Sequence, residues 1–246
     1  MKIIISPAKR MIQDLDFLQP LAYPVFIKRA QALKEHLQKL KYDDLKRILD
    51  CNDKIAALSM EQYKNMDLYH NLTPAVLAFD GIQYRYMAPR VFDKDCFHYI
   101  QQHLRILSAF YGILRPMDGV TSYRLEMQTK LKSSSWKDLY DYWKDIIYKE
   151  LVKGEDVVLN LASKEYSKIF EPYLERHIRY ITCKFGEKTD GRIKEKGVYV
   201  KMSRGEMVRY MAEHNITGAE AVKCFNRLGY CFDEKLSDDT SFVFVR

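Results

Sequence analysis

Short, almost wholly apolar runs recur along this chain and constrain its fold more than any other feature. Each is rich in β-branched or aromatic residues, which is typical of strands buried in a sheet, and they span residues 2–6, 104–108, 157–163, 180–185 and 241–246. Segments with helical periodicity separate them, without repeats or low-complexity tracts. This alternation predicts an α/β fold, with a mixed sheet and surrounding helices. Because no linker rich in glycine or proline divides the chain, residues 1–246 are expected to form a single domain.

The segments between the apolar runs predict most of the helices. Residues 24–40 begin with Pro24, which suits the first turn of a helix, and place Leu33 and Leu37 on one apolar face. Further helices are expected over residues 42–50, from Asp93 to Ile100, around residues 142–151, and after Ser163.

Three capping boxes are expected to open additional helices, since each pairs a hydroxyl residue with a Glu or Gln three positions later: Ser59 with Gln62, Ser203 with Glu206, and Thr217 with Glu220. Two more strands are expected. One covers residues 75–87 and turns at Asp80–Gly81, and the other covers residues 198–202.

The charge balance favours an anionic partner. Lysine and arginine number 40 against 33 acids, a formal net charge of +7, which is typical of proteins that bind nucleic acid, nucleotides or phosphorylated metabolites. The apolar run at the N-terminus is too short for a signal peptide, and no segment approaches the roughly 20 apolar residues that span a bilayer. The sequence therefore predicts a cytoplasmic protein without a membrane partner.

Cysteine and histidine spacing supports neither a metal site nor a disulfide framework. The five cysteines are scattered and the six histidines form no H-x-x-x-H pair. We therefore expect reduced thiols, no metal and no cofactor. The sequence does not give the oligomeric state, and a monomer is favoured.

Three places share one design, in which polar or cationic residues follow the end of an expected strand. The first holds Ser6, Lys9 and Arg10; the second holds Arg115, Arg124 and Glu126; the third holds Lys201, Ser203, Arg204, Gly205 and Arg209. Ligands of α/β proteins sit at the carboxyl ends of strands, and a helix N-terminus beside an arginine can hold phosphate. Together the three places predict an anion-binding cleft.

Each place also has a purely structural interpretation. Ser6-Pro7 is an ordinary turn, and Lys9 can be a solvated side chain. Arg124 and Glu126, two apart on an expected strand, can pair with each other. The cleft is therefore inferred from the three places together.

The motifs that carry this chemistry resemble those of the YaaA peroxide stress protein family. They occur in the expected order and cover nearly the whole chain: SPAK from Ser6, AFDGIQY from Ala78, LRILSAFYGILRPMD from Leu104, YRLEM from Tyr123, VVLNLAS from Val157, SRGEMVRY from Ser203, GYCFDEKLS from Gly229 and FVFVR from Phe242. The resemblance implies a single α/β domain of unusual fold that binds DNA, carries a helix-hairpin-helix element, and limits iron-driven DNA damage under peroxide.

The segment from Tyr42 to Leu58 is the best candidate for that element. Two short helices are expected to flank residues 51–53, and Asn52 could adopt the left-handed conformation that a tight turn needs, although no glycine is present. Cationic residues on and beside this pair are the candidate DNA contacts: Lys39, Lys41, Lys46, Arg47 and Lys54. An ordinary helical pair with solvated lysines remains an alternative.

Two functions follow from these observations. The first is sequence-independent binding of single- or double-stranded DNA, with phosphates held by lysine and arginine. The second is an enzyme that acts on a nucleobase or nucleotide in a pocket formed by Lys9, Arg124, Glu126 and Arg204. A pocket that contains a carboxylate of perturbed pKa would favour the enzyme, and a broad basic surface would favour the binding protein.

Overall fold

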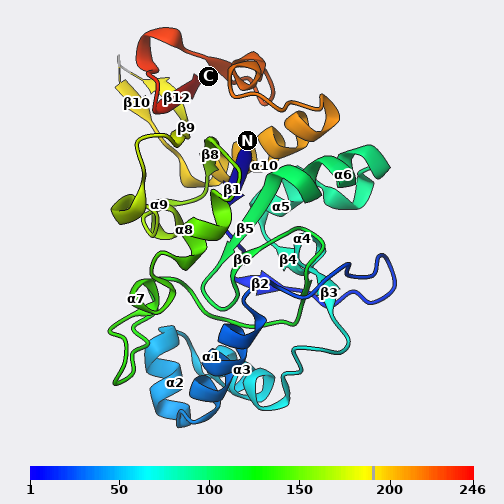
Figure 1. The fold of residues 1–246 in the computed structure, drawn as a ribbon, viewed down its shortest axis with the longest axis vertical. Coiled ribbons are helices and arrows are strands. Elements are labelled where there is room, and N and C mark those ends of the chain that lie inside the picture. The colour runs from blue at the N-terminus through cyan, green and yellow to red at the C-terminus, as the bar shows by residue number, and fades with distance from the viewer. Residues whose placement is uncertain (190–191) are drawn as a thin grey trace.

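A mixed eight-stranded sheet forms the centre of the computed structural model, which describes residues 1–189 and 192–246 (Figure 1). Its strands are β1 (Lys2–Ile5), β5 (Leu104–Ser108), β6 (Gly112–Leu114), β8 (Val157–Leu161), β9 (Arg179–Thr189), β10 (Arg192–Lys194), β11 (Cys231–Phe232) and β12 (Ser241–Val245). The order is β11-β12-β9-β8-β1-β5-β6, and β10 pairs with β9. The five strands from β12 to β5 are parallel, and antiparallel pairs lie at the margins.

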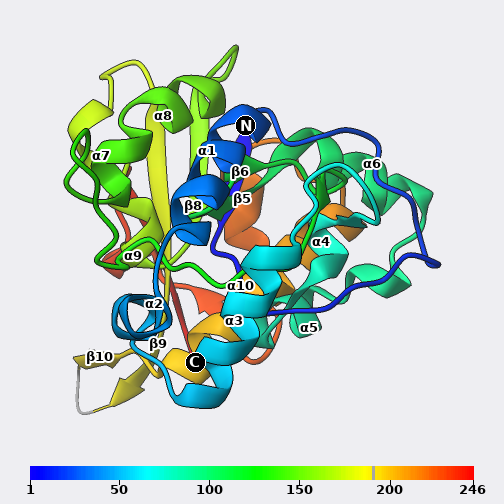
Figure 2. The ribbon, with the colours of Figure 1, turned by 90° about the horizontal axis from the view of Figure 1, so that it is seen from below.

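Helices lie on both sides of this sheet. Figure 2 shows α7 (Leu139–Trp143), α8 (Ile146–Leu151) and α9 (Lys164–Ser167) on one side of the central strands, with α5 (Ile82–Met87), α6 (Lys94–His103) and α10 (Gly197–Glu213) on the other. Three helices gather at the end of the molecule away from the C-terminus (Figure 1): α1 (Ile27–Gln38), α2 (Tyr42–Leu49) and α3 (Asp53–Asn65).

Short elements complete the described chain. They are β2 (Arg10–Met11), β3 (Thr73–Pro74), α4 (Ala75–Ala78), β4 (Phe79–Asp80), β7 (Gly119–Val120) and the 3-10 turns η1 (Pro89–Val91), η2 (Glu171–Tyr173), η3 (Glu220–Cys224) and η4 (Glu234–Leu236). Strand β2 pairs with β4, and β3 pairs with β7, so these loops are tied together beside the main sheet.

The central strand is β1, and its sequence explains its place. Ile3, Ile4 and Ile5 are fully buried and pair with β5 on one side and β8 on the other. A strand covered on both faces needs apolar residues at successive positions instead of alternate ones. One hydrophobic cluster extends from this strand to Leu33 of α1 and to Phe244 of β12. The α/β architecture predicted from the apolar runs is confirmed.

The expected strand over residues 198–202 is wrong, because these residues belong to α10. Ser203 does not cap a helix there: its hydroxyl donates to the carbonyl of Tyr199 one turn earlier, at 2.9 Å. Glu206 accepts a hydrogen bond from Arg227, at 2.9 Å. The expected helix N-terminus beside Arg204 is therefore absent, since α10 begins seven residues earlier at Gly197.

Residues 75–87 also differ from the expected hairpin. They form the one-turn helix α4, the two-residue strand β4, and then α5, which begins after Gly81. A Cβ on Gly81 would lie 2.9 Å from the Cβ of Ala8, so this turn packs closely on the loop that follows β1. Tertiary packing has overridden the local preference of the apolar run.

The remaining differences concern helix ends. Ser59 lies inside α3, whose N-cap is Asn52, and the turn after Thr217 begins only at Glu220, so neither expected capping box forms. The helix expected over residues 142–151 is divided at Lys144, which has a φ of 47°. Asp93 caps α6 as predicted, because its carboxylate accepts from the N–H of Cys96.

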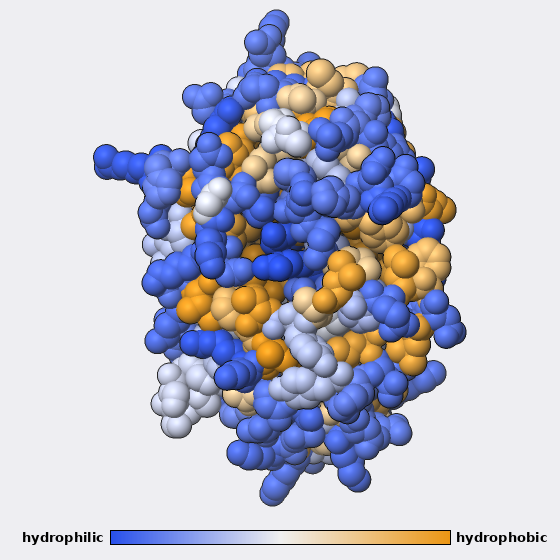
Figure 3. Space-filling view, turned by 45° about the vertical axis from the view of Figure 1, so that its right-hand side comes forward, coloured by the Kyte–Doolittle hydropathy of each residue, from blue (hydrophilic) through white to orange (hydrophobic). Residues whose placement is uncertain are grey.

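The surface in Figure 3 is mainly hydrophilic, with apolar patches between the polar side chains. The most exposed large apolar residues of the described chain include Leu21, Val91 and Val198. No helix in the part of the chain that the structure describes is long and apolar enough to cross a membrane.

Candidate functional site

A pocket of about 490 Å³ lies where the strand order of the sheet reverses. The chain passes from β1 to β5 on one side and later places β8 on the other side of β1. In open α/β sheets, the carboxyl ends of strands at such a reversal form a crevice for ligands. Ser6 follows β1, Ser163 follows β8, and both line the pocket.

The two serines join the neighbouring strand ends. The N–H of Ser163 donates to the hydroxyl of Ser6 at 2.8 Å, and the hydroxyl of Ser6 donates to that of Ser163 at 3.1 Å. The carbonyl of Ser6 accepts from the hydroxyl of Tyr84 in α5, at 3.0 Å. These bonds fix the floor of the pocket to two strands and one helix, so the loops above it start from defined positions.

Charged side chains make this pocket predominantly cationic, and we call it the cationic pocket. Its lining includes five cations and three acids: Lys9, Arg10, Arg124, Lys201, Arg204, Asp80, Glu126 and Glu165. Five positive charges against three negative ones favour an anionic ligand.

The loop after β7 supplies Arg124 and Glu126. No strand forms here, so the two side chains are not strand neighbours as expected, although they do approach each other: Nη2 of Arg124 lies 3.9 Å from Oε1 of Glu126. Glu126 is closer to Lys9, whose Nζ lies 2.8 Å from Oε2. The loop is anchored by the hydroxyl of Tyr63 in α3, which donates to the carbonyl of Arg124. Glu126 thus holds two cations from different loops at one wall.

Helices α5 and α10 supply two further groups of the pocket, Gln83 and Arg204. They pack backbone against backbone at Gly205, where a Cβ would lie only 2.0 Å from the carbonyl oxygen of Gln83. Only glycine permits this approach. Burial lowers the pKa of Arg204, because desolvation disfavours the charged guanidinium.

Two of the acids have shifted pKa values of opposite sign. Burial raises the pKa of Glu165, and the nearby charge of Glu126 acts in the same direction. Hydrogen bonding from Arg85 lowers the pKa of Asp80, which also pairs with Arg10 at 3.0 Å. Glu165 is therefore more readily protonated than Asp80.

The structure brings most of the candidate cleft residues together. Six of the eight line the cationic pocket: Ser6, Lys9, Arg124, Glu126, Lys201 and Arg204. Arg115 is exposed outside it, and Arg209 pairs with Glu213 on α10, at 2.7 Å. Sequence reasoning missed Gln83, Ser163 and Glu165 as pocket residues. For the last two, the polar residues directly after the run at 157–161 were an available signal.

The candidate hairpin is a real helical pair, with a turn that differs from the expectation. Asp50 has the left-handed conformation, with φ 45°, and Asn52 instead caps α3 by accepting from the N–H of Ile55, at 3.0 Å. Leu58, the last residue of the candidate segment, is exposed.

The cationic side chains of the pair fall into two groups. Lys46 pairs with Asp53 at 2.7 Å, and Arg47 pairs with Asp44 at 2.6 Å. The other three candidate DNA contacts are exposed: Lys39, Lys41 and Lys54. Asp53 places a negative charge at the start of α3, so the exposed lysines are the groups most available to phosphate.

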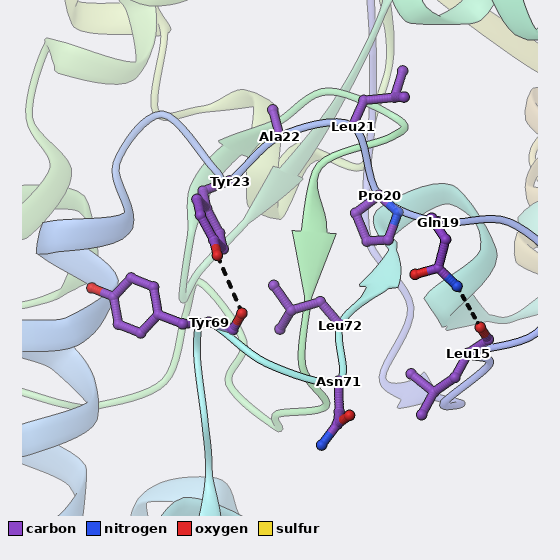
Figure 4. A pocket seen from close by; sticks show the side chains of 9 residues that line it. All are labelled: Leu15, Gln19, Pro20, Leu21, Ala22, Tyr23, Tyr69, Asn71 and Leu72. Atoms are coloured by element: carbon purple, nitrogen blue, oxygen red, sulfur yellow. Dashed lines mark hydrogen bonds between the residues drawn. The ribbon is translucent and has the colours of Figure 1, made fainter.

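A second pocket, of about 620 Å³, has a different character (Figure 4). It is lined by Leu15, residues 19–23, Tyr69, Asn71 and Leu72. Its polar groups bond to one another: the hydroxyl of Tyr23 donates to the carbonyl of Tyr69, and the amide of Gln19 donates to the carbonyl of Leu15. The residues shown lining it carry no formal charge. It is therefore a poorer match for an anionic ligand than the cationic pocket.

Within residues 1–189 and 192–246, no group of three or more His, Cys, Asp or Glu side chains is arranged to hold a metal ion.

Comparison with known proteins identifies the family of this chain. A family model described as peroxide stress protein YaaA matches residues 1–236. The chain belongs to the peroxide stress protein YaaA family. The resemblance drawn from the ordered motifs is thereby confirmed. The match spans every residue that lines the cationic pocket.

Relatives match the chain along its whole length. A UPF0246 protein of Desulfitobacterium hafniense is 58% identical over 246 residues, covering 100% of this chain and 98% of the relative. UPF0246 proteins of Lachnoclostridium phytofermentans and Pediococcus pentosaceus are 50% and 44% identical, each over 100% of this chain and over 96% and 98% of their own lengths. The similarity to these relatives therefore extends over the whole chain.

Proposed function

We propose that this member of the peroxide stress protein YaaA family binds DNA with low sequence preference and holds a backbone phosphate in the cationic pocket. The observation that carries the proposal is the convergence of Arg124 and Arg204 on one pocket at the carboxyl ends of β1 and β8. Guanidinium groups match phosphate oxygens with two parallel N–H bonds, which is why arginine recurs at phosphate sites. The formal charge of +7 adds a general attraction to a polyanion.

The helical pair offers a surface for flanking phosphates. Tyr63 of α3 bonds to the backbone of Arg124, so this helix directly contacts the pocket loop. The exposed Lys39, Lys41 and Lys54 lie on and beside the same pair. A strand that enters the pocket would therefore find further cations near α3. Limiting iron-driven DNA damage under peroxide is the role we propose for this binding.

Titration of labelled DNA at several salt concentrations tests the proposal. Each phosphate contact should add about −0.9 to the slope of log affinity against log salt on duplex DNA. Arg124→Lys keeps the charge and loses the paired N–H geometry, so it should weaken binding by about tenfold or more. Arg115→Lys is the matched control, because Arg115 lies in the same stretch and outside the pocket. No binding at low salt, or equal losses in both variants, would exclude this site.

An enzyme acting on a nucleobase or nucleotide is the second candidate, and Glu165 favours it. Its raised pKa and its place beside Glu126 give the pocket a carboxyl group suited to proton transfer. Glu165→Gln should then abolish release of a product from DNA or nucleotides and leave binding intact. For a binding protein, the same change should leave affinity equal or slightly higher, since it removes a negative charge, and no product should form with either protein.

A further inference from the structure

Hydrogen-bond donors without partners are concentrated in the cationic pocket. In the described part of the chain, five buried side-chain nitrogen or oxygen atoms lack a hydrogen-bond partner, and three of them belong to pocket residues: Nε2 of Gln83, Nε of Arg124 and Nε of Arg204. Gln83 is only 7% exposed. The three residues come from α5, the loop after β7, and α10, so no single local distortion leaves all three unpaired.

Such donors are costly unless something binds them. A buried donor without an acceptor destabilises a fold by about 1–3 kcal/mol, and more when it is charged. The backbone contact at Gly205 holds α5 and α10 too close for Gln83 and Arg204 to separate and become solvated. The three residues all line one pocket, and polar side chains that converge on a pocket are the usual form of a site built for a specific ligand.

The chemistry of the three donors divides into two kinds. Two guanidinium groups match a phosphate. The amide of Gln83 is neutral and presents both a donor and an acceptor, which adds little to phosphate binding and matches the N–H and C=O groups on the edge of a nucleobase.

The wall of the pocket is partly aromatic. Tyr84 and Tyr123 line it, and their hydroxyls are engaged elsewhere, with the carbonyl of Ser6 and the hydroxyl of Ser108. Both side chains are buried in the core, so only a small part of each can meet a ligand. The volume of about 490 Å³ lies within the range of roughly 300–1,000 Å³ found for small-ligand pockets.

We propose that the cationic pocket binds a single nucleotide unit, with its phosphate on Arg124 and Arg204 and the edge of its base on Gln83. This inference rests on the proposed function, because it takes the unit to be one nucleotide turned out of a DNA strand, as proteins that read single bases in a pocket require. A free nucleoside monophosphate carries the same chemistry, so the two sources are separated by experiment.

Calorimetric titration of the full chain tests the pocket itself. The probes are the four deoxynucleoside 5′-monophosphates, the matching nucleosides and inorganic phosphate. At least one monophosphate should bind about tenfold or more tightly than its nucleoside and than inorganic phosphate, because only it offers both a phosphate to Arg124 and Arg204 and a base edge to Gln83. Equal affinity for inorganic phosphate and every monophosphate would overturn the proposal and leave an anion site without a base subsite.

Variants of Gln83 identify the group that binds the base. Gln83→Leu removes the amide, and Gln83→Glu keeps its size and removes its donor. Both variants should lower the affinity for the preferred monophosphate by about tenfold. Gln83→Leu should leave the affinity for inorganic phosphate unchanged, whereas the negative charge of Gln83→Glu can also reduce it. Gln128→Leu is the control, since Gln128 is exposed and does not line the pocket. Thermal melting confirms that each variant is folded; monophosphate affinity equal to wild type in either folded Gln83 variant would refute the assignment.

DNA with one unpaired nucleotide, compared with a fully paired duplex, identifies the source. Tighter binding of the unpaired form, competed by the preferred monophosphate and weakened by Gln83→Leu, is the expected result. If both DNAs bind equally and no monophosphate competes, the inference fails and the proposed DNA binding stands. If monophosphates bind and neither DNA does, the proposed function fails and the nucleotide site belongs to a free metabolite.

Discussion

Gly205 offers the most direct test of how the cationic pocket is assembled. Gly205→Ala would place a Cβ 2.0 Å from the carbonyl oxygen of Gln83 and 2.9 Å from the backbone nitrogen of Met87. Since both neighbours are backbone atoms of α5, no side chain can rotate away. The two helices must separate by about 1 Å to restore ordinary contact distances, and this loosens the van der Waals contacts between them.

The expected magnitude follows from two opposing effects. Overpacking of this kind costs about 3 kcal/mol at the upper end of its usual range, because the backbone itself must shift. Alanine inside a helix is intrinsically better than glycine by about 1 kcal/mol, which offsets part of the cost. The net loss is about 2 kcal/mol, and for a chain of this length the melting temperature should fall by roughly 4–8 °C.

Thermal melting followed by circular dichroism measures the change. Gly197→Ala is the matched control, since it adds the same methyl group to the first residue of the same helix, where it meets no atom within 4 Å. The control should melt at or slightly above the wild-type temperature. If Gly205→Ala also melts at or above that temperature, the close approach of α5 and α10 is not what positions Gln83 and Arg204.

Three further predictions concern other parts of the chain. Burial raises the pKa of Asp118 to about 6, so the folded state binds the proton more tightly than the unfolded state, and the free energy of unfolding falls as pH rises from about 4 to 6. Asp118→Asn should remove up to about 3 kcal/mol of this pH dependence, as measured by urea unfolding. Identical pH profiles for the variant and the wild type would contradict the prediction. Ser6→Ala should lower the free energy of unfolding by about 1–2 kcal/mol, because it leaves the N–H of Ser163 without its acceptor, whereas an equal effect of Ser163→Ala, which keeps that N–H bonded, would argue against this cause. If the α2–α3 pair binds DNA, Lys41→Ala with Lys54→Ala, which removes two of its exposed lysines, should weaken binding to all sequences alike and flatten the salt slope by up to about 1.8, and unchanged affinity in the folded double variant would place the DNA surface elsewhere.

Local sequence patterns predicted the central sheet well, for a clear reason. Consecutive apolar residues such as Ile3, Ile4 and Ile5 place apolar side chains on both faces of a strand, and only a central strand covered on both faces buries them all. The family motifs, in their order, were also sufficient to identify the family, since the order of residues along a chain needs no structure to be recognised.

Local patterns failed where partners distant in sequence decided the outcome. Val198 and Val200 look like strand residues, and they became part of α10 because that helix packs on α5 through Gly205. Ser59 and Ser203 look like helix caps, yet each lies inside a helix whose length is set by its buried face. In these cases tertiary contacts outweighed propensities worth only tenths of a kcal/mol per residue.

The candidate site divides along the same line. The amino-acid sequence by itself determined which cations were available, because Lys9, Arg124 and Arg204 stand out from their neighbours by charge and motif. Only the tertiary structure decided that they share one pocket, since that depends on the reversal of strand order at β1 and on the fit of α10 against α5. Gln83 became a site residue for the same physical reason: a neutral amide has no distinguishing mark in sequence, and its importance arises only when folding buries it without a partner.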